Sequence, residues 1–273
     1  MSQAPDVKEL LSSAKEEGSI SQSTFELLSD VDIGARIQAG LGLTVDDVQA
    51  SEVFLVTLLI DDSGSIRFAG NTQVMRDGNN LIIDSLIATK QVDNILMSTR
   101  YLNGDIISPF VLIDQAVRLD TSNYDPNGGT PLYDMTLETL GTVLVKSQEF
   151  ADQGVMVRSI TVIVSDGNDQ HSPRQHGGRG TAPADCAELV KKMLLSEQHI
   201  VAAMGIDDGT TDFKDVFRSM GIHDEWVLTP GNNESEIRHA WGFVSQSAVR
   251  ASQGAASFSE TALGGFGEED DGS

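Results

Sequence analysis

Between about residues 50 and 250, continuous apolar runs alternate with stretches whose apolar positions have helical spacing. VFLVTLLI (53–60) and SITVIVS (159–165) are rich in β-branched residues, which is typical of central strands buried on both faces. HIVAAMGI (199–206) and EWVLTP (225–230) predict two further strands. The helical spacing predicts helices over 73–89, 131–150, 184–197, 211–220 and 234–249.

A hairpin is predicted between the first two helices of this region. The segments 94–102 and 105–113 flank Asn103-Gly104, a pair that favours a two-residue turn between antiparallel strands. Pro109 has no backbone N–H to donate, so it places the second strand at a sheet edge. The order of elements predicts an α/β fold with a mainly parallel sheet, one antiparallel edge strand and helices on both faces.

Residues 1–50 lack this alternation and have short helical patterns instead. The apolar residues of 7–14 have helical spacing, and a second short helix is predicted to begin at its N-cap Ser23, with Glu26 as the capping-box acid. Residues 34–45 contain too much glycine for a prediction. We interpret the segment as an N-terminal helical extension that packs on the main domain or on a partner.

The main domain is predicted to span residues 51–249, and residues 250–273 differ from it in composition. They are rich in Ser, Gly and Ala and contain four consecutive acids, which predicts a flexible acidic tail. The simplest role of such a tail is to keep the protein soluble. A further hypothesis is self-association, in which the tail supplies a carboxylate to a metal site from Glu268, Glu269, Asp270 or Asp271.

The net charge is −23, from 41 acidic and 18 basic residues. A surface of this charge repels phosphate backbones and anionic lipids, which argues against nucleic-acid and membrane binding. It attracts divalent cations and basic partners, although an acidic excess also serves solubility alone. Cys186 is the single cysteine, so an intramolecular disulfide and a site built from several thiolates are excluded.

The N-terminal sequence lacks the basic start and apolar core of a signal peptide. No apolar run approaches the roughly 20 residues that span a bilayer. We therefore expect a cytoplasmic protein.

Oxygen-bearing side chains occur in three segments that should meet at one edge of the sheet. Asp61, Ser63 and Ser65 follow the first strand. Thr130 precedes the long helix, and Asp166 follows the second buried strand. In open α/β sheets, ligands bind beyond the carboxyl ends of the strands. Hard oxygen ligands select Mg²⁺, Ca²⁺ or Mn²⁺ over softer metals, so the pattern predicts a divalent-metal site.

Three of these five side chains are neutral hydroxyls. Ser63 and Ser65 stand two positions apart on a tight loop and can point at one ion, and Thr130 would complete one face. Asp61 and Asp166 would act directly or through bound water. A metal held by hydroxyls and waters keeps much of its positive charge, and Mg²⁺ keeps exchangeable waters. Such a metal would attract the carboxylate of an Asp or Glu on a protein partner.

The motif DxSxS after a hydrophobic strand, the later threonine in GGTPLYD and the later aspartate in SDG resemble the metal-ion-dependent adhesion site (MIDAS) of von Willebrand factor A (vWA) domains. The resemblance covers roughly residues 50–249 and keeps the family's order. It implies a Rossmann-like, doubly wound sheet. It also implies direct metal binding by Ser63, Ser65 and Thr130, with Asp61 and Asp166 acting through water.

Intracellular members of the family often serve as adaptors for MoxR-type AAA+ ATPases or work beside kinase and phosphatase partners. The resemblance therefore implies a non-catalytic adaptor or scaffold in a cytoplasmic complex. The alternative is a metal-dependent hydrolase on the same fold, with Asp62 or Asp169 as general base. The sequence contains no P-loop, GxSxG elbow or HExxH motif.

Each site residue also has a simpler structural role. Asp61 and Ser63 are good helix-capping types, Thr130 is an ordinary residue at a helix start, and Asp166 is an ordinary turn residue. The metal site is favoured because all of them, together with Ser65, converge on one sheet edge.

Residues 167–183 form a long polar loop beside the predicted site. The loop is either a specificity loop that contacts the partner or a solvated insertion. Its candidate partner contacts are Asp169, His171 and Arg174. Asp62, next to the first ligand, is a fourth candidate, and both acids also suit the outer shell of the metal or a solvated surface.

Overall fold

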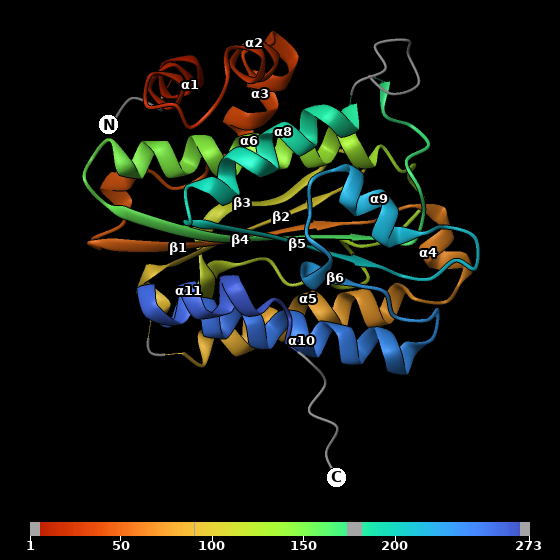
Figure 1. The fold of residues 1–273 in the computed structure, drawn as a ribbon. Coiled ribbons are helices and arrows are strands. Elements are labelled where there is room, and N and C mark those ends of the chain that lie inside the picture. The colour runs from red at the N-terminus through yellow and green to blue at the C-terminus, as the bar shows by residue number, and fades with distance from the viewer. Residues whose placement is uncertain (1–5, 90, 174–181, 268–273) are drawn as a thin grey trace.

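A six-stranded sheet forms the centre of the protein in the computed structural model, which describes residues 6–89, 91–173 and 182–267 (Figure 1). The strand order is β3-β2-β1-β4-β5-β6, and only the β2–β3 pair is antiparallel. The strands are β1 (Glu52–Ile60), β2 (Ile95–Tyr101), β3 (Ile106–Leu112), β4 (Met156–Ser165), β5 (His199–Gly205) and β6 (Val227–Leu228). The predicted α/β fold with one antiparallel edge strand is confirmed, and Pro109 lies in that edge strand.

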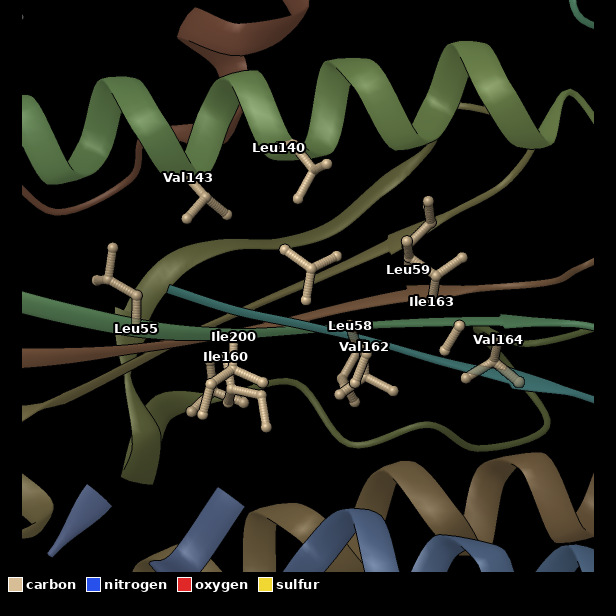
Figure 2. Close-up of a cluster of buried hydrophobic side chains, with 14 of the residues drawn as sticks. Leu55, Leu58, Leu59, Leu140, Val143, Ile160, Val162, Ile163, Val164 and Ile200 are labelled. Atoms are coloured by element: carbon tan, nitrogen blue, oxygen red, sulfur yellow. The ribbon is translucent and has the colours of Figure 1, made fainter. Parts of the chain in front are cut away.

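The two central strands, β1 and β4, are buried on both faces of the sheet. Leu59 and Ile163 lie on the side of Leu140 from α6, whereas Leu58 and Val162 point to the opposite side (Figure 2). Because successive side chains in a strand alternate between the two faces, a strand covered on both sides favours apolar residues on both. This explains why the runs at 53–60 and 159–165 are mostly apolar, with the buried Thr57 and Thr161 as the exceptions inside them.

Helical layers cover both faces of the sheet (Figure 1). One layer contains α6 (Leu132–Ala151), α8 (Ala182–Leu195) and α9 (Phe213–Ser219). The other contains α5 (Thr72–Ile87), α10 (Glu234–Ser252) and α11 (Ala255–Gly264). The short helix α4 (Gly64–Phe68) follows β1. The 3-10 turns are η1 (Val45–Asp47), η2 (Val92–Asn94), η3 (Ile113–Gln115) and η4 (Asp224–Trp226). Over the described ranges, no helix combines the length and apolar character that crossing a membrane requires.

The N-terminal helices α1 (Val7–Glu16), α2 (Gln22–Leu28) and α3 (Val31–Gly40) form a third layer on the outer side of α6 (Figure 1). The contact is close, since a Cβ atom at Gly141 of α6 would lie 2.9 Å from Leu28 Cδ2. Every residue of α6 from Leu132 to Phe150 is buried as a result.

The N-terminal cap of α2 differs from what the sequence predicted, and α3 includes residues for which no prediction was made. Ser21 caps α2 by accepting the Thr24 amide at 3.1 Å, so the prediction of Ser23 as the cap is wrong. The glycine-rich stretch left without a prediction is partly helical. Asp30 caps α3, and the apolar side chains of Ile33 and Ile37 are buried. Packing thus outweighs the low helix propensity of glycine.

Charged groups at the base of the third layer hold it in place. Arg100 of β2 is 5% exposed and donates to the Arg36 carbonyl oxygen at 3.2 Å. Lys146 of α6 is completely buried and donates to the Leu43 carbonyl oxygen. Arg36 also forms a 3.1 Å ion pair with Glu138 of α6. Buried charges need such partners, so the N-terminal segment completes the surroundings of α6 and β2.

The segment after Arg250 is ordered in the structure as far as residue 267, where the sequence predicted a flexible tail. Phe258 in α11 packs edge-to-face on Phe54 of β1, with ring centroids 6.4 Å apart. Phe266 contacts Trp226 in the same way at 4.9 Å. Two aromatic side chains thus dock a stretch of mostly small residues, and the prediction is wrong for residues 251–267. The acids of the self-association hypothesis, at 268–271, lie outside the described residues.

Candidate metal centre

Two of the predicted site residues follow neighbouring parallel strands and therefore meet at one edge of the sheet. Asp61 comes directly after β1 and Asp166 directly after β4, and these strands are paired along their whole length. The Asp61 amide donates to the Val164 carbonyl oxygen at 3.0 Å, which continues the pairing beyond the end of β1.

The loop that carries Thr130 is joined to the DxSxS loop by backbone pairing. Gly128 forms an isolated parallel bridge with Ser63. Its carbonyl oxygen accepts the Gly64 amide at 3.3 Å, and its own amide donates to the Asp62 carbonyl oxygen at 2.9 Å. The three sequence segments therefore lie together, as the motif predicts for a common site.

The two serine hydroxyls and the Asp166 carboxylate form a compact oxygen cluster. Ser63 Oγ and Ser65 Oγ are 2.8 Å apart. Ser65 Oγ donates to Asp166 Oδ1 at 2.7 Å, and Ser63 Oγ lies 3.4 Å from the same oxygen. The hydroxyls of residues i and i+2 thus face one point, as expected for a shared ligand.

Asp61 organises this cluster from below. It is completely buried, and its Oδ1 atom accepts the Ser63 amide at 2.8 Å. Its Oδ2 atom accepts the Ser165 hydroxyl at 2.7 Å and the Asp166 amide at 3.3 Å. Burial raises the pKa of Asp61 above its ordinary value, while the serine hydrogen bonds act in the opposite direction. Asp61 therefore fixes both neighbouring loops through one carboxylate.

Asp166 is buried beside Asp61, and burial together with the Asp61 charge raises its pKa to about 6. The hydrogen bonds from Ser65 and Ser63 partly oppose this rise. The nearby charges that shift the pKa of Asp62 and of Asp166 belong to acids. Among the described residues, no basic side chain neutralises these carboxylates.

The donor set fits a hard divalent cation. Two buried carboxylates and at least two hydroxyls share one small region without a basic partner, and a cation there would remove the repulsion between the acids. Clusters of three or more His, Cys, Asp or Glu suited to a metal ion are absent from the described parts of the chain. A metal at this edge would therefore depend on the serine and threonine hydroxyls, as Mg²⁺ and related ions allow.

His171 supports the Thr130 loop. Its Nδ1 atom accepts the Thr130 amide at 3.0 Å, so the neutral ring carries its proton on Nε2. The Gln170 amide donates to the Thr130 carbonyl oxygen at 3.0 Å. His171 is itself exposed, so it can both position the loop and face a partner.

The other acidic candidates hold the protein's own backbone. Asp62 is 5% exposed and accepts the Asn103 amide at 3.0 Å, and burial raises its pKa to about 6. Asp169 is 7% exposed and accepts the Tyr133 amide at 3.2 Å, at the start of α6. Both carboxylates thus hold backbone amides of this chain, and their role as partner contacts stays a prediction. Arg174 lies outside the described residues.

Sequence reasoning missed two residues that support Asp61. Ser165, the last residue of β4, donates to Asp61 Oδ2, and the Tyr124 hydroxyl donates to the Asp61 carbonyl oxygen at 2.5 Å. Ser165 belongs to the SDG motif, so its position next to Asp166 was an available signal. Tyr124 lies in a loop far along the chain and carries no such signal.

Comparisons with known proteins identify the fold. No protein-family model and no curated protein sequence matches this chain. Among solved structures, the chain is similar to the pilus adhesin SpaC from Lactobacillus rhamnosus GG, with a TM-score of 0.52 and 9% identity over 74% of this chain and 31% of that one.

Two further similar structures have von Willebrand names. One is a von Willebrand factor type A protein from Catenulispora acidiphila, with a TM-score of 0.45 and 13% identity over 73% of this chain and 43% of that one. The other is the vWF domain of the pilus tip protein Mfa5 from Porphyromonas gingivalis. Its TM-score is 0.49, and the identity is 10% over 76% of this chain and 98% of that one. The chain thus spans less than half the length of the first two proteins. The fold is vWA-like.

Proposed function

We propose that this protein is a binding module that uses a divalent cation to hold an acidic side chain of a partner protein. The observation that carries the proposal is the cluster of Ser63, Ser65 and Asp166 oxygens above the buried Asp61, with no basic partner among the described residues. The vWA-like fold supports it, because domains of this type typically bind other proteins.

The ligand chemistry favours a carboxylate as the group that is bound. Mg²⁺, Ca²⁺ or Mn²⁺ at this site would be held by Ser63, Ser65 and Thr130, with Asp61 and Asp166 as supporting acids. The bound cation would supply a positive charge with exchangeable water positions. An Asp or Glu of the partner would replace one such water, because few of the protein's own carboxylates offset the charge.

Binding is favoured over hydrolysis by the state of the two candidate bases. Asp62 and Asp169 each accept a backbone amide of the protein itself. These bonds leave further lone pairs on each carboxylate, but both side chains are almost completely buried, at 5% and 7% exposed. A general base must lie within hydrogen-bonding reach of the attacking water, and this burial restricts that access. Turnover of a phosphomonoester in Mg²⁺ that Asp61→Ala abolishes would instead support the hydrolase.

The more specific role follows from the sequence resemblance. By that resemblance, the protein is an adaptor in a cytoplasmic complex, beside a MoxR-type AAA+ ATPase or a kinase–phosphatase pair. Affinity capture with the full chain, in Mg²⁺ and in excess chelator, identifies a partner whose retention depends on the metal.

The direct test is titration calorimetry with Mn²⁺ and Mg²⁺. Ser63→Ala combined with Ser65→Ala should weaken metal binding by more than about 10-fold, because it removes two of the ligands. The matched control is Ser196→Ala, which removes an exposed hydroxyl that donates to the Met193 carbonyl oxygen after α8, next to the amino end of β5 and thus at the opposite edge of the sheet. Unchanged metal affinity in the double variant contradicts the proposal.

A second readout separates ligands from structural hydroxyls. In excess chelator, the double variant should lose no more than about 1–2 kcal/mol of unfolding free energy, which is the loss expected from its hydrogen bonds alone. A much larger loss would show that Ser63 and Ser65 mainly hold the loop together.

A further inference from the structure

A groove lies between the N-terminal helices and α6, beside the candidate metal centre. Its volume is about 710 Å³, within the usual range for ligand-binding pockets. Helices α2 and α3 line one wall, and the first turns of α6 line the other. The extension therefore does more than cover α6, because it shapes a concave surface at the same end of the molecule as the site.

The groove is continuous with the loops that build the metal centre. Asn103, Pro131 and His171 all line it. The Asn103 amide donates to Asp62, and the His171 ring accepts the Thr130 amide. A partner whose carboxylate reaches the metal would thus have its neighbouring residues next to this groove.

The lining combines an apolar floor with an acidic rim. Leu27, Ile33 and Met135 contribute apolar side chains to it. Glu26, Asp30 and Asp32 also line it, and all three are exposed.

The rim acids are not neutralised within the described parts of the chain. Asp30 caps α3, and Glu26 accepts the Gln22 side-chain amide, but neither forms an ion pair there. The one arginine in the lining, Arg36, is paired with Glu138.

This combination matches the side chains of arginine and lysine. Their methylene stems pack on apolar surface, while their charged ends stay at the solvent and pair with acids. We infer that the groove binds a basic residue of the partner, next in the chain to the acidic residue held at the metal. The inference rests on the proposed function for the acidic half of this motif, and it gives the N-terminal extension a role in specificity.

Short synthetic peptides with a fluorescent label test the inference on the full-length protein. One series carries a central Asp in a Gly-Ser background, with one Arg placed at successive positions on either side. A second series has Gln in place of Arg, and a third has Asn in place of Asp. Fluorescence anisotropy gives the affinity of each peptide in Mg²⁺ and in excess chelator.

Two protein variants distinguish an effect of the groove on peptide affinity from an effect of the protein's net charge. Glu26→Gln with Asp32→Asn neutralises two rim acids and leaves the Asp30 cap in place. The matched control, Glu16→Gln with Glu17→Gln, removes the same charge from exposed positions at the end of α1, outside the groove.

We expect Arg at its best position to tighten binding to the unaltered protein by about two- to five-fold, the range of exposed ion pairs. The rim variant should lose this advantage and the control variant should keep it. An advantage that survives in the rim variant, or that falls equally in the control, overturns the inference.

The two proposals fail in different ways. If Asp and Asn peptides bind equally in Mg²⁺, the metal-dependent function fails, and the Arg advantage still tests the groove in the Asn series. If Asp peptides bind through the metal but Arg adds nothing, the function stands and the inference about the groove is overturned.

Discussion

The two ends of the central strands bury titratable groups in different ways. At the carboxyl end, Asp61 and Asp166 lie together without a basic partner among the described residues, and burial raises the pKa of both. At the amino end of β5, His199 is buried against Ser159, with 2.8 Å between Nδ1 and Oγ. Burial lowers the pKa of His199 to about 4.

The difference shows which buried polar groups still carry charge without a partner of opposite charge. The neutral imidazole and the serine hydroxyl share a hydrogen bond and carry no charge, so the Ser159–His199 pair needs no counter-ion. The two carboxylates are hydrogen-bonded, but their charges repel each other. Burial alone therefore does not mark a site; an uncompensated charge does.

The largest expected effect is a pH dependence of the unfolding free energy that His199 causes. Unfolded histidine takes up a proton near pH 6.5, whereas folded His199 does so only near pH 4. Between these values only the unfolded state is protonated, so the contribution to stability is complete above pH 6.5 and falls by up to about 3.4 kcal/mol toward pH 4. Chemical unfolding of the unaltered protein and of His199→Gln, at neutral pH and near pH 4, measures it. A stability difference between them that does not vary with pH contradicts this account.

A somewhat smaller effect concerns the acidic end and the metal. Mg²⁺ at 100 times its dissociation constant should stabilise the protein by about 2.7 kcal/mol, because only the folded state binds it. Asp166→Asn should lose this gain, whereas His199→Gln should keep it. Thermal or chemical unfolding with and without Mg²⁺ provides the measurement. Equal stabilisation by Mg²⁺ in the two variants would show that Asp166 does not support a metal site.

The smallest effect is the difference in stability between two variants that each remove one serine, one from each end. Ser165 donates to the Asp61 carboxylate and Ser159 pairs with the neutral His199, and both serines are completely buried. In Mg²⁺, Ser165→Ala should cost about 1.5–3 kcal/mol, since hydrogen bonds to charged groups are stronger. Ser159→Ala should cost about 0.5–1.5 kcal/mol. Unfolding free energies in the reverse order would show that Asp61 is neutral even with metal present.

The sheet and the meeting of the three motif segments were predictable because both follow from local patterns. Continuous apolar runs indicated β1 and β4, and strands paired in parallel end at one edge. The sequence order of Asp61, Thr130 and Asp166 was then enough to place them together. The distances within the cluster depend on side-chain directions that a sequence pattern does not contain.

The roles of Asp62, Asp169 and His171 were harder to predict for the same reason. Each is a polar residue near the motif, and a sequence does not tell whether such a side chain faces the solvent or a backbone amide. The order of residues 251–267 was also missed. Two isolated aromatic residues, Phe258 and Phe266, hold this segment on the domain, although the surrounding Ser, Gly and Ala predicted a flexible chain.

The burial of α6 on all sides constrains how the sequence of this protein can evolve. Gly141 leaves room for Leu28, and Lys146 depends on a carbonyl oxygen near residue 43. A larger residue at position 141 would clash with Leu28, and loss of the N-terminal segment would remove one acceptor of the buried Lys146 and leave Glu149 as its partner. The N-terminal helices and α6 should therefore be inherited as a unit, and grafting this extension onto another vWA-like domain should fail unless α6 is transferred with it.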